Sequence, residues 1–255
     1  MLIVGKILAG FVVGTLIGMT GVGGGVLMLP ILIFGLGVPP IVAVGSDALF
    51  NFITRLGSSY VHLTRGTVKR KVVLSLAAGS IPGSILGVGL LRYLRSVYGG
   101  GVNSFITTAI GILLIIVPIL LMFQNQIEEH VSHRPPTMKS LVGMSAIGLL
   151  AGFLVGMTSV GSGSIIMMLL LLFYSFPPKI MVGADIVHGV LLTGVTSFLH
   201  FKLGNVDLPL VASLVIGSIP GGLLGSHLST RMPVPWLRRI VCAALFATGA
   251  RMLWA

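Results

Sequence analysis

The sequence predicts an all-α membrane protein, a polytopic bundle of transmembrane helices built from two inverted repeats, each with a broken helix or a re-entrant hairpin. Its mean hydropathy is +1.09 and 8% of its residues are charged, whereas soluble domains carry about 25% charged residues. Apolar stretches near the roughly 20 residues that cross a bilayer recur along the whole chain. The second half also repeats the first. A chain of 255 residues with this composition has no room for a separate soluble catalytic domain.

The repeat has a constant offset of 138 residues, the distance from Gly18 to Gly156, and no gap. Repeats that interrupt apolar segments at corresponding places are typical of secondary transporters, and the interruptions point to the binding site. The matching pairs are Gly18–Gly25 with Gly156–Gly163, Pro39–Pro40 with Pro177–Pro178, Gly45–Asp47 with Gly183–Asp185, His62 with His200, and Gly79–Gly83 with Gly217–Gly221.

Each half contains five apolar segments, which we predict to be helical because a helix satisfies its own backbone hydrogen bonds in lipid. The second segment of each half is too short to cross comfortably, and it follows a glycine-rich break. Each break therefore predicts two half-helices that meet near the membrane middle, or a re-entrant hairpin. The segments cover about 2–20, 25–37, 41–63, 72–93 and 102–123, and about 140–158, 163–175, 179–201, 208–229 and 236–254.

The predicted organisation is a first transmembrane repeat at 1–123, a hydrophilic linker at 124–139 and a second transmembrane repeat at 140–255. Each repeat would cross the membrane an odd number of times, either five times or three times with an added hairpin. The second copy would therefore be inverted relative to the first. Loop charge favours the same arrangement, with both termini outside. If the basic loop 64–71 lies inside, ten basic residues lie inside (Arg65, Lys69, Arg70, Lys71, Arg134, Lys139, Lys179, Arg231, Arg238, Arg239) and five outside (Lys6, Arg92, Arg95, Lys202, Arg251).

Glycines recur every four residues along two segments of each half. Small residues at this spacing give a flat helical face that lets another backbone approach closely. We predict that these ridges are packing surfaces between the halves or between protomers, so a homodimer is left open. The ridges are Gly10, Gly14 and Gly18 with Gly148, Gly152 and Gly156, and Gly79, Gly83 and Gly87 with Gly217, Gly221 and Gly225.

The first candidate site is the pair of glycine-rich breaks. Exposed backbone is tolerated at membrane depth only where protein or a water-filled cavity receives it. A half-helix that starts after such a break directs unpaired N–H groups and its positive dipole end at the cavity, which favours an anion. A packed kink with no ligand is the structural alternative. The predicted substrate-binding positions are Thr20, Gly21, Gly23, Gly24, Gly25, Thr158, Ser159, Gly161, Ser162 and Gly163, with a further hydroxyl at Ser164.

The second candidate is the pair Asp47 and Asp185, the only acidic residues within the predicted membrane segments. A carboxylate inside a membrane is expensive and is by default a functional hypothesis. Each one could carry a proton, pair with Arg55, or cap a half-helix. We predict that both belong to proton or ion coupling, together with His188, and capping remains the alternative.

The third candidate is Arg55, eight residues after Asp47 and so on nearly the same helical face. Its planar guanidinium suits paired oxygens of a carboxylate, sulfonate or sulfite. The alternative is a permanent salt bridge with Asp47. Asn51, one turn from each, is also predicted to bind substrate, whereas His62 and His200 are expected to be interfacial hydrogen-bonders.

Other classes of function are disfavoured. An intramembrane serine protease built on Ser162 and His200 would need glycine at position 160, which is Val160, so we predict no enzyme. Too few carboxylates and histidines are available for a metal site, and no cofactor is expected. Cys242 is the single cysteine, which excludes an intramolecular disulfide. The net charge of +11 is spread between apolar segments, so it indicates loops that orient helices and not nucleic-acid binding.

Over nearly its whole length and in both copies, the chain resembles the TauE/SafE sulfite-exporter family. The resemblance rests on Gly21–Gly25 with Leu27–Pro30, Val38–Pro40, Ala43–Asp47, Arg65–Val68, Gly79–Gly83 and Gly204–Asp207. Many members have Gly-Thr-Asp or Gly-Thr-Ser where this chain has Gly45–Asp47 and Gly183–Asp185. Ala184 lacks that hydroxyl, so the two aspartates are expected to be unequal.

The resemblance implies a permease of the cell inner (plasma) membrane, of the kind linked to export of sulfite, sulfonates and related compounds. We expect a multi-pass secondary transporter that exports a small sulfur oxyanion, coupled to a proton or ion gradient, with the lipid bilayer and a small anion as its partners. The site would lie between the two breaks at the membrane midplane. The mismatched pairs Arg55/Thr193, Gly24/Ser162 and Asn51/Gly189 would make that site asymmetric. A passive anion channel, or a permease for another small anion such as a carboxylate, is the alternative.

Overall fold

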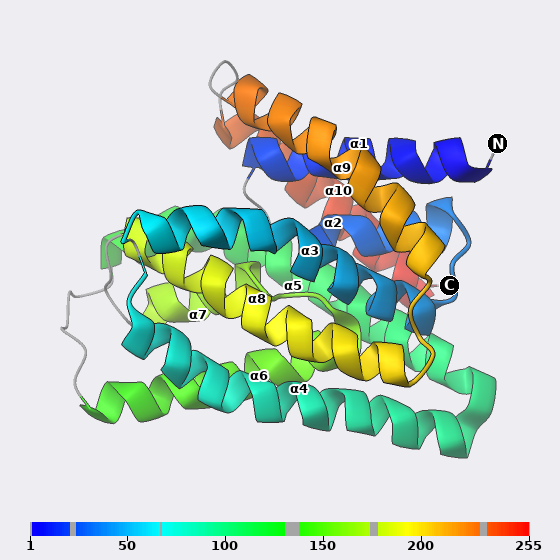
Figure 1. The fold of residues 1–255 in the computed structure, drawn as a ribbon, viewed down its shortest axis with the longest axis horizontal. Coiled ribbons are helices and arrows are strands. Elements are labelled where there is room, and N and C mark those ends of the chain that lie inside the picture. Colours follow the sequence, from blue (N-terminus) through cyan, green and yellow to red (C-terminus); the bar gives the residue numbers. More distant parts are fainter. Residues whose placement is uncertain are drawn as a thin grey trace.

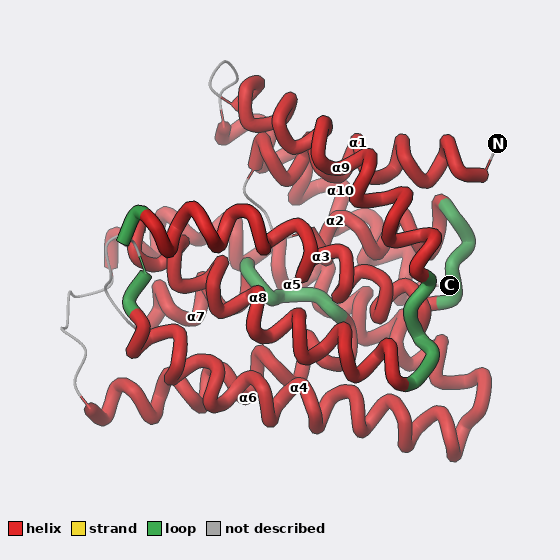
Figure 2. Tube along the Cα trace, in the orientation of Figure 1, coloured by secondary structure: helices red, strands yellow, loops and turns green. Residues whose placement is uncertain are grey.

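The computed structural model describes residues 2–20, 24–66, 68–130, 138–173, 178–229 and 234–254. These residues form ten α-helices, with no strand among them, which confirms the predicted all-α class (Figures 1 and 2). In the first half, the helices are α1 (Leu2–Thr20), α2 (Gly24–Pro30, continued by the π-helical turn Ile31–Gly35), α3 (Pro40–Thr64), α4 (Arg70–Tyr98) and α5 (Val102–His130). In the second half, they are α6 (Met138–Thr158), α7 (Ser164–Phe173), α8 (Pro178–Lys202), α9 (Leu208–Ser229) and α10 (Val234–Trp254).

Among the described residues, four apolar helical stretches are long enough to cross a membrane: Arg70–Met122, which takes in α4 and most of α5, Leu141–Thr158, Ile180–Lys202 and Leu208–Gly225. The apolar stretches Ile3–Met19 and Gly24–Gly35 are shorter. The composition of these helices is that of a membrane protein. Helix α5 ends at His130, so it extends into the stretch predicted as a linker; the division of the chain at 124–139 stays a prediction.

Proline fixes the start of α3. Pro40 is its first residue, where the missing N–H would have had no partner inside the helix, and the fixed φ of proline already suits a helix. The preceding Pro39 is extended, with φ −53° and ψ 134°. Helix α8 also has a proline as its first residue, Pro178, the counterpart of Pro40. The repeated Pro-Pro therefore sets where the two central helices begin.

The halves pack through exchanged pairs of helices. Helix α1 lies along α9 and α4 along α6, while α3 packs against α8 and α5 against α10. In Figure 1 the α1–α9 and α4–α6 pairs lie at opposite edges, with α3 and α8 between them. Helices α3 and α8 are counterparts in the repeat and run antiparallel, since Gly45 faces His200 and Gly189 faces Arg55. Two inverted copies would produce this pattern; their orientation across a bilayer stays a prediction.

The glycine ridges lie at the α1–α9 and α4–α6 contacts. A Cβ atom at Gly14 would collide with the backbone of Ser218, and one at Gly83 with the carbonyl oxygen of Leu149. Helices that approach this closely exclude any side chain larger than hydrogen at these positions. The ridges therefore pack the halves against each other, and each edge pair forms one tightly joined unit.

Candidate functional site

Both repeats contain the predicted helix break. Helix α1 ends at Thr20 and α2 begins at Gly24, while α6 ends at Thr158 and α7 begins at Ser164. In the second break Ser159 has a φ of 58° and Gly161 a φ of 99°. A non-glycine residue at such a φ is uncommon, and strain of this kind clusters at functional sites. The predicted site residues Gly21 and Gly23, and the side chains of Thr20 and Ser164, lie outside the described residues.

The two breaks meet at the start of α2. A Cβ atom on Gly25 would lie 2.6 Å from the carbonyl oxygen of Ser159 and 2.8 Å from Oδ2 of Asp47. Gly24 lies against Asn51 in the same way. Because glycine leaves this space empty, the first break, the second break and α3 come together at one point.

Asp47 connects these elements through hydrogen bonds. It is 0% exposed, and its Oδ2 accepts a 2.7 Å bond from Oγ of Ser159 and a 2.9 Å bond from Nδ2 of Asn51. The same amide nitrogen is also 2.9 Å from the carbonyl oxygen of Asp47. Within the described part of the chain, Oδ1 of Asp47 has no hydrogen-bond partner. A buried carboxyl oxygen without a partner is costly, so Asp47 is a candidate for a role beyond packing.

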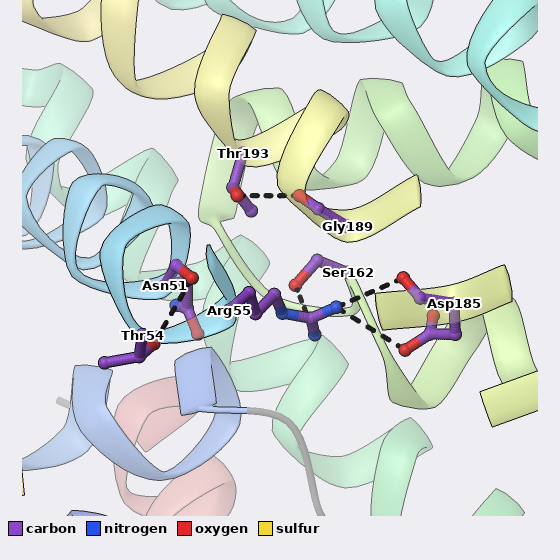
Figure 3. Close-up of polar contacts among 7 residues, drawn as sticks. All are labelled: Asn51, Thr54, Arg55, Ser162, Asp185, Gly189 and Thr193. Carbon is purple, nitrogen blue, oxygen red and sulfur yellow. Dashed lines mark hydrogen bonds and ion pairs between the residues drawn. The ribbon is translucent and has the colours of Figure 1, made fainter. Parts of the chain in front are cut away.

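Arg55 points from α3 towards α8 and the second break (Figure 3). Its Nη1 lies 3.4 Å from the carbonyl oxygen and 3.5 Å from Oδ2 of Asp185, and its Nη2 donates to Oγ of Ser162 at 3.3 Å. The ion pair of Arg55 is therefore with Asp185 and not with Asp47, the alternative that the sequence suggested. Charge-assisted bonds are usually about 2.7–2.9 Å long, so these contacts hold the guanidinium loosely.

Gly189 provides the room for this guanidinium. A Cβ atom at position 189 would collide with Nη1 of Arg55. The counterpart of Gly189 is Asn51, and the counterpart of Arg55 is Thr193, whose hydroxyl donates to the carbonyl oxygen of Gly189 at 2.7 Å (Figure 3). The mismatched pairs of the repeat thus lie together, because Ser162, the counterpart of Gly24, also contacts Arg55.

A cavity of about 870 Å³ opens beside Arg55. It lies between the α1–α9 pair and α3, with further walls from α2, α5, α7 and α8. Of the predicted site residues, Gly24, Asn51, Arg55, Gly163 and Asp185 line it. Much of the remaining wall is apolar, including Ile17, Phe50, Met167 and Met168. A large, mostly apolar cavity with a few convergent polar groups is the usual form of a small-molecule site.

Other predicted residues lie beside the cavity wall without forming it. The hydroxyl of Thr158 donates to the carbonyl oxygen of Leu154 at 2.7 Å and accepts a 3.2 Å bond from the amide of Val160, so it stabilises the second break. Gly161 supplies backbone geometry there. His188 contacts α4, where its Nε2 is 2.7 Å from Oγ of Ser80.

His200, predicted to be interfacial, is instead 0% exposed and its Nε2 is 3.0 Å from the carbonyl oxygen of Gly156. Serine and threonine residues on α4 and α8 were not singled out from the sequence, although Ser80, Ser84 and Thr196 are buried and hydrogen-bonded between helices. The sequence pattern that could have indicated them is the pair Ser80 and Ser84, four residues apart and each next to a glycine of the ridge. Among the described residues, no three His, Cys, Asp or Glu side chains gather where they could hold a metal ion.

Comparison with known proteins now gives the family. The family model described as sulfite exporter TauE/SafE matches residues 6–252. The chain belongs to the TauE/SafE family. It is 36% identical to a Bacillus subtilis protein named "probable membrane transporter protein YjnA". The alignment covers 97% of this chain and 98% of that protein.

A second relative from Bacillus subtilis, named "probable membrane transporter protein YunE", is 27% identical and covers 97% of this chain and 96% of its own. A protein of Methanocaldococcus jannaschii with the same kind of name is 26% identical, over 97% of this chain and 94% of its own. No solved structure matches the chain. The family and the names of these relatives indicate a membrane transporter rather than an enzyme.

Proposed function

We propose that the chain is a secondary transporter of the cell inner membrane that exports a small sulfur oxyanion, either sulfite or an organosulfonate. The observation that supports this most is Arg55, a guanidinium that lines a largely apolar cavity next to the junction of two broken helices. Transporters of the inverted-repeat class bind substrate at such junctions. A charged side chain among apolar segments is expensive to keep, so its presence points to a substrate.

The geometry around Arg55 leaves hydrogen-bonding capacity for an anion. A guanidinium has five N–H donors in a rigid fork, and the contacts of this one within the described residues, with Asp185 and Ser162, are 3.3–3.5 Å long. A sulfite or sulfonate group presents paired oxygens to such a fork. It would replace these long contacts with shorter charge-assisted bonds. The hydroxyl of Ser162, whose oxygen accepts from Arg55, would donate its hydrogen to the same anion.

Asp47 is the favoured coupling residue in this proposal. Its buried carboxyl group joins α3 to the second break through Ser159, and Gly25 of the first break packs against its Oδ2. A proton on Oδ1 would neutralise the Asp47 carboxylate, which contacts residues of both breaks. Asp185 instead serves as the counter-ion of Arg55, so an arriving anion competes with it. His188 lies outside the cavity wall and is the weakest of the three predicted coupling residues.

A thermal-shift screen of the purified protein tests substrate binding. Sulfite, sulfate, thiosulfate, sulfoacetate, taurine and acetate are added separately at two pH values. We expect sulfite or a sulfonate to raise the unfolding temperature most, because a ligand that binds only the folded state stabilises it. Arg55→Gln should abolish the shift, whereas Arg92→Gln, at an exposed position of α4, should keep it.

Two results of this screen would count against the proposal. A larger shift with acetate than with any sulfur anion would favour a carboxylate permease. An equal shift in the parent and Arg55→Gln would show that the anion binds elsewhere. Flux far above transporter rates in liposomes, with no response to a proton gradient, would favour a passive channel.

A further inference from the structure

The cavity has a counterpart on the other side of the molecule that is closed. Applying the offset of 138 residues to the cavity wall moves Phe50 to His188 and Ser58 to Thr196, both on α8. It also relates Ser218 and Gly222 of α9 to Ser80 and Ser84 of α4. The first set lines the open cavity between α9 and α3. In the second set, all four side chains are 0% exposed.

Two hydrogen bonds hold the closed side together. Oγ of Ser80 lies 2.7 Å from Nε2 of His188, and Oγ of Ser84 lies 2.7 Å from Oγ1 of Thr196. We name these four residues the α4–α8 latch. On the open side, Phe50 and Gly222 cannot make the equivalent bonds, because neither has a polar side-chain atom. The latch is therefore present at only one of the two counterpart interfaces, α4–α8 and not α9–α3.

We infer that the α4–α8 latch is the closed gate of the transport path, and that it opens as the α1–α9 pair closes on α3. This inference rests on the proposed function. The internal repeat supports it. The counterpart interfaces α9–α3 and α4–α8 have related sequences, but the first is open and the second is closed. Each interface therefore shows the arrangement that the other would adopt after the exchange. The glycine contacts join α1 to α9 and α4 to α6 so closely that each pair moves as a unit.

The latch explains why the structure is open on one side. Closing it contributes two buried hydrogen bonds that the opposite closure lacks, so the arrangement seen here is favoured without substrate. In the topology predicted from loop charge, the cavity faces the cytoplasm and the latch closes the outer side. That is the loading state of an exporter. His188 is then a positioning residue of the gate, and it acts on substrate access without touching the anion.

Matched pairs of cysteines test the exchange directly, in a Cys242→Ala background. Ser84→Cys with Thr196→Cys replaces two hydroxyls whose oxygens are 2.7 Å apart, and an oxidant should link them at once. Ser58→Cys with Gly222→Cys is the counterpart pair, and both of its positions line the open cavity. A Cβ at Gly222 meets only the carbonyl oxygen of Gly14, at 3.8 Å, so cysteine fits there. Gel shifts report both cross-links without any substrate.

We expect both pairs to form disulfides, the Ser58–Gly222 pair more slowly, because it needs the exchanged state. The locked Ser84–Thr196 protein should lose transport and regain it with dithiothreitol. A Ser58–Gly222 pair that never cross-links in a protein that still transports would overturn the inference. So would full transport by the locked Ser84–Thr196 protein. If both links form in turn but no sulfur oxyanion is moved, the gate stands and the proposed substrate is wrong.

Thiol labelling of single variants gives a second measurement that does not need a disulfide. Ser58→Cys should react readily with a membrane-impermeant maleimide, and Thr196→Cys slowly. Adding Ser80→Ala to Thr196→Cys should speed its labelling about tenfold, the factor expected for losing one buried hydrogen bond. The control adds Ser213→Ala to Thr196→Cys. The hydroxyl of Ser213 is exposed and donates to the carbonyl oxygen of Pro209 in its own helix. Equal labelling rates with both additions would contradict the role of the latch.

Discussion

The two central helices, α3 and α8, are copies of each other with opposite surroundings. Helix α3 presents Arg55 to an open cavity, whereas at the counterpart position α8 has Thr193, which is buried and bonds to its own helix. The glycine ridges and the Pro-Pro starts are the same in both halves. The duplication therefore supplies the scaffold, and the positions where the copies differ lie at the proposed site.

The three mismatches depend on one another in physical terms. The guanidinium of Arg55 occupies the space that an asparagine at position 189 would fill. Ser162 offers it a hydroxyl oxygen, where Gly24 offers none. Gly24 in turn leaves room for Asn51, which orients Asp47. A change at one of these positions is expected to disturb the others, which gives several ways to break the comparison.

The largest effect is expected where the halves are alike. Gly83→Val and its counterpart Gly221→Val would each drive a side chain into the facing backbone, at Leu149 and Phe11 respectively. Overpacking of this kind costs about 1–3 kcal/mol, and more where backbone must move. Thermal unfolding in detergent should show both variants destabilised by similar amounts. Gly89→Val, at a site with no atom within 4 Å, is the control. A loss confined to one half would show that the scaffolds are not equivalent.

The next largest effect is expected on transport, at the position where the two copies differ around Arg55. Gly189→Ala adds a methyl group where the guanidinium lies, so it should displace Arg55 without removing its charge. We expect transport to fall about tenfold or more, since bonds to a charged group are worth about 1.5–3 kcal/mol. Initial rates in proteoliposomes measure it, with Gly89→Ala as the control. An unchanged rate would show that the position of Arg55 does not matter.

The two aspartates should give different phenotypes. Asp47→Asn keeps the hydrogen-bonding shape but cannot carry the proton, so exchange down a substrate gradient should persist while the response to an imposed proton gradient is lost. Asp185→Asn should keep that response and bind the anion more tightly, because Arg55 loses its counter-ion. Counterflow and gradient-driven uptake, measured side by side, distinguish them. Identical behaviour of both variants would remove the asymmetry that we assign to the site.

The smallest effect is expected at the first break. Gly24→Ser makes the first half match Ser162 of the second, and its Cβ would lie 2.5 Å from Oδ1 of Asn51. Asn51 is a flexible side chain that can shift, so transport should fall only a few-fold, about the effect of weakening one neutral hydrogen bond. A complete loss of activity in well-folded protein would mean that the first break is held more rigidly than the contacts suggest.

Much of this arrangement could be predicted from the sequence because the repeat gives each position a partner. The predicted ends of α3 and α8 lie within one residue of the observed ones, and a proline marks the start of each helix. The sequence could not decide between Asp47 and Asp185 as the partner of Arg55. Spacing along α3 places Asp47 on the same face, but the guanidinium reaches across to Asp185 because Gly189 leaves space there. The α4–α8 latch could not be predicted either, because a hydroxyl in an apolar segment does not reveal which helix it faces.

The most direct test of the central claim is export of labelled sulfite and sulfoacetate from proteoliposomes that contain the parent, Arg55→Gln or Arg92→Gln. The account predicts export by the parent and by Arg92→Gln, and a loss of about 100-fold for Arg55→Gln, as expected when charge-assisted bonds to the substrate are removed. All three proteins should unfold at similar temperatures. Export by Arg55→Gln at the parent rate would contradict the account, because the anion would then cross without the one guanidinium that lines the cavity described here.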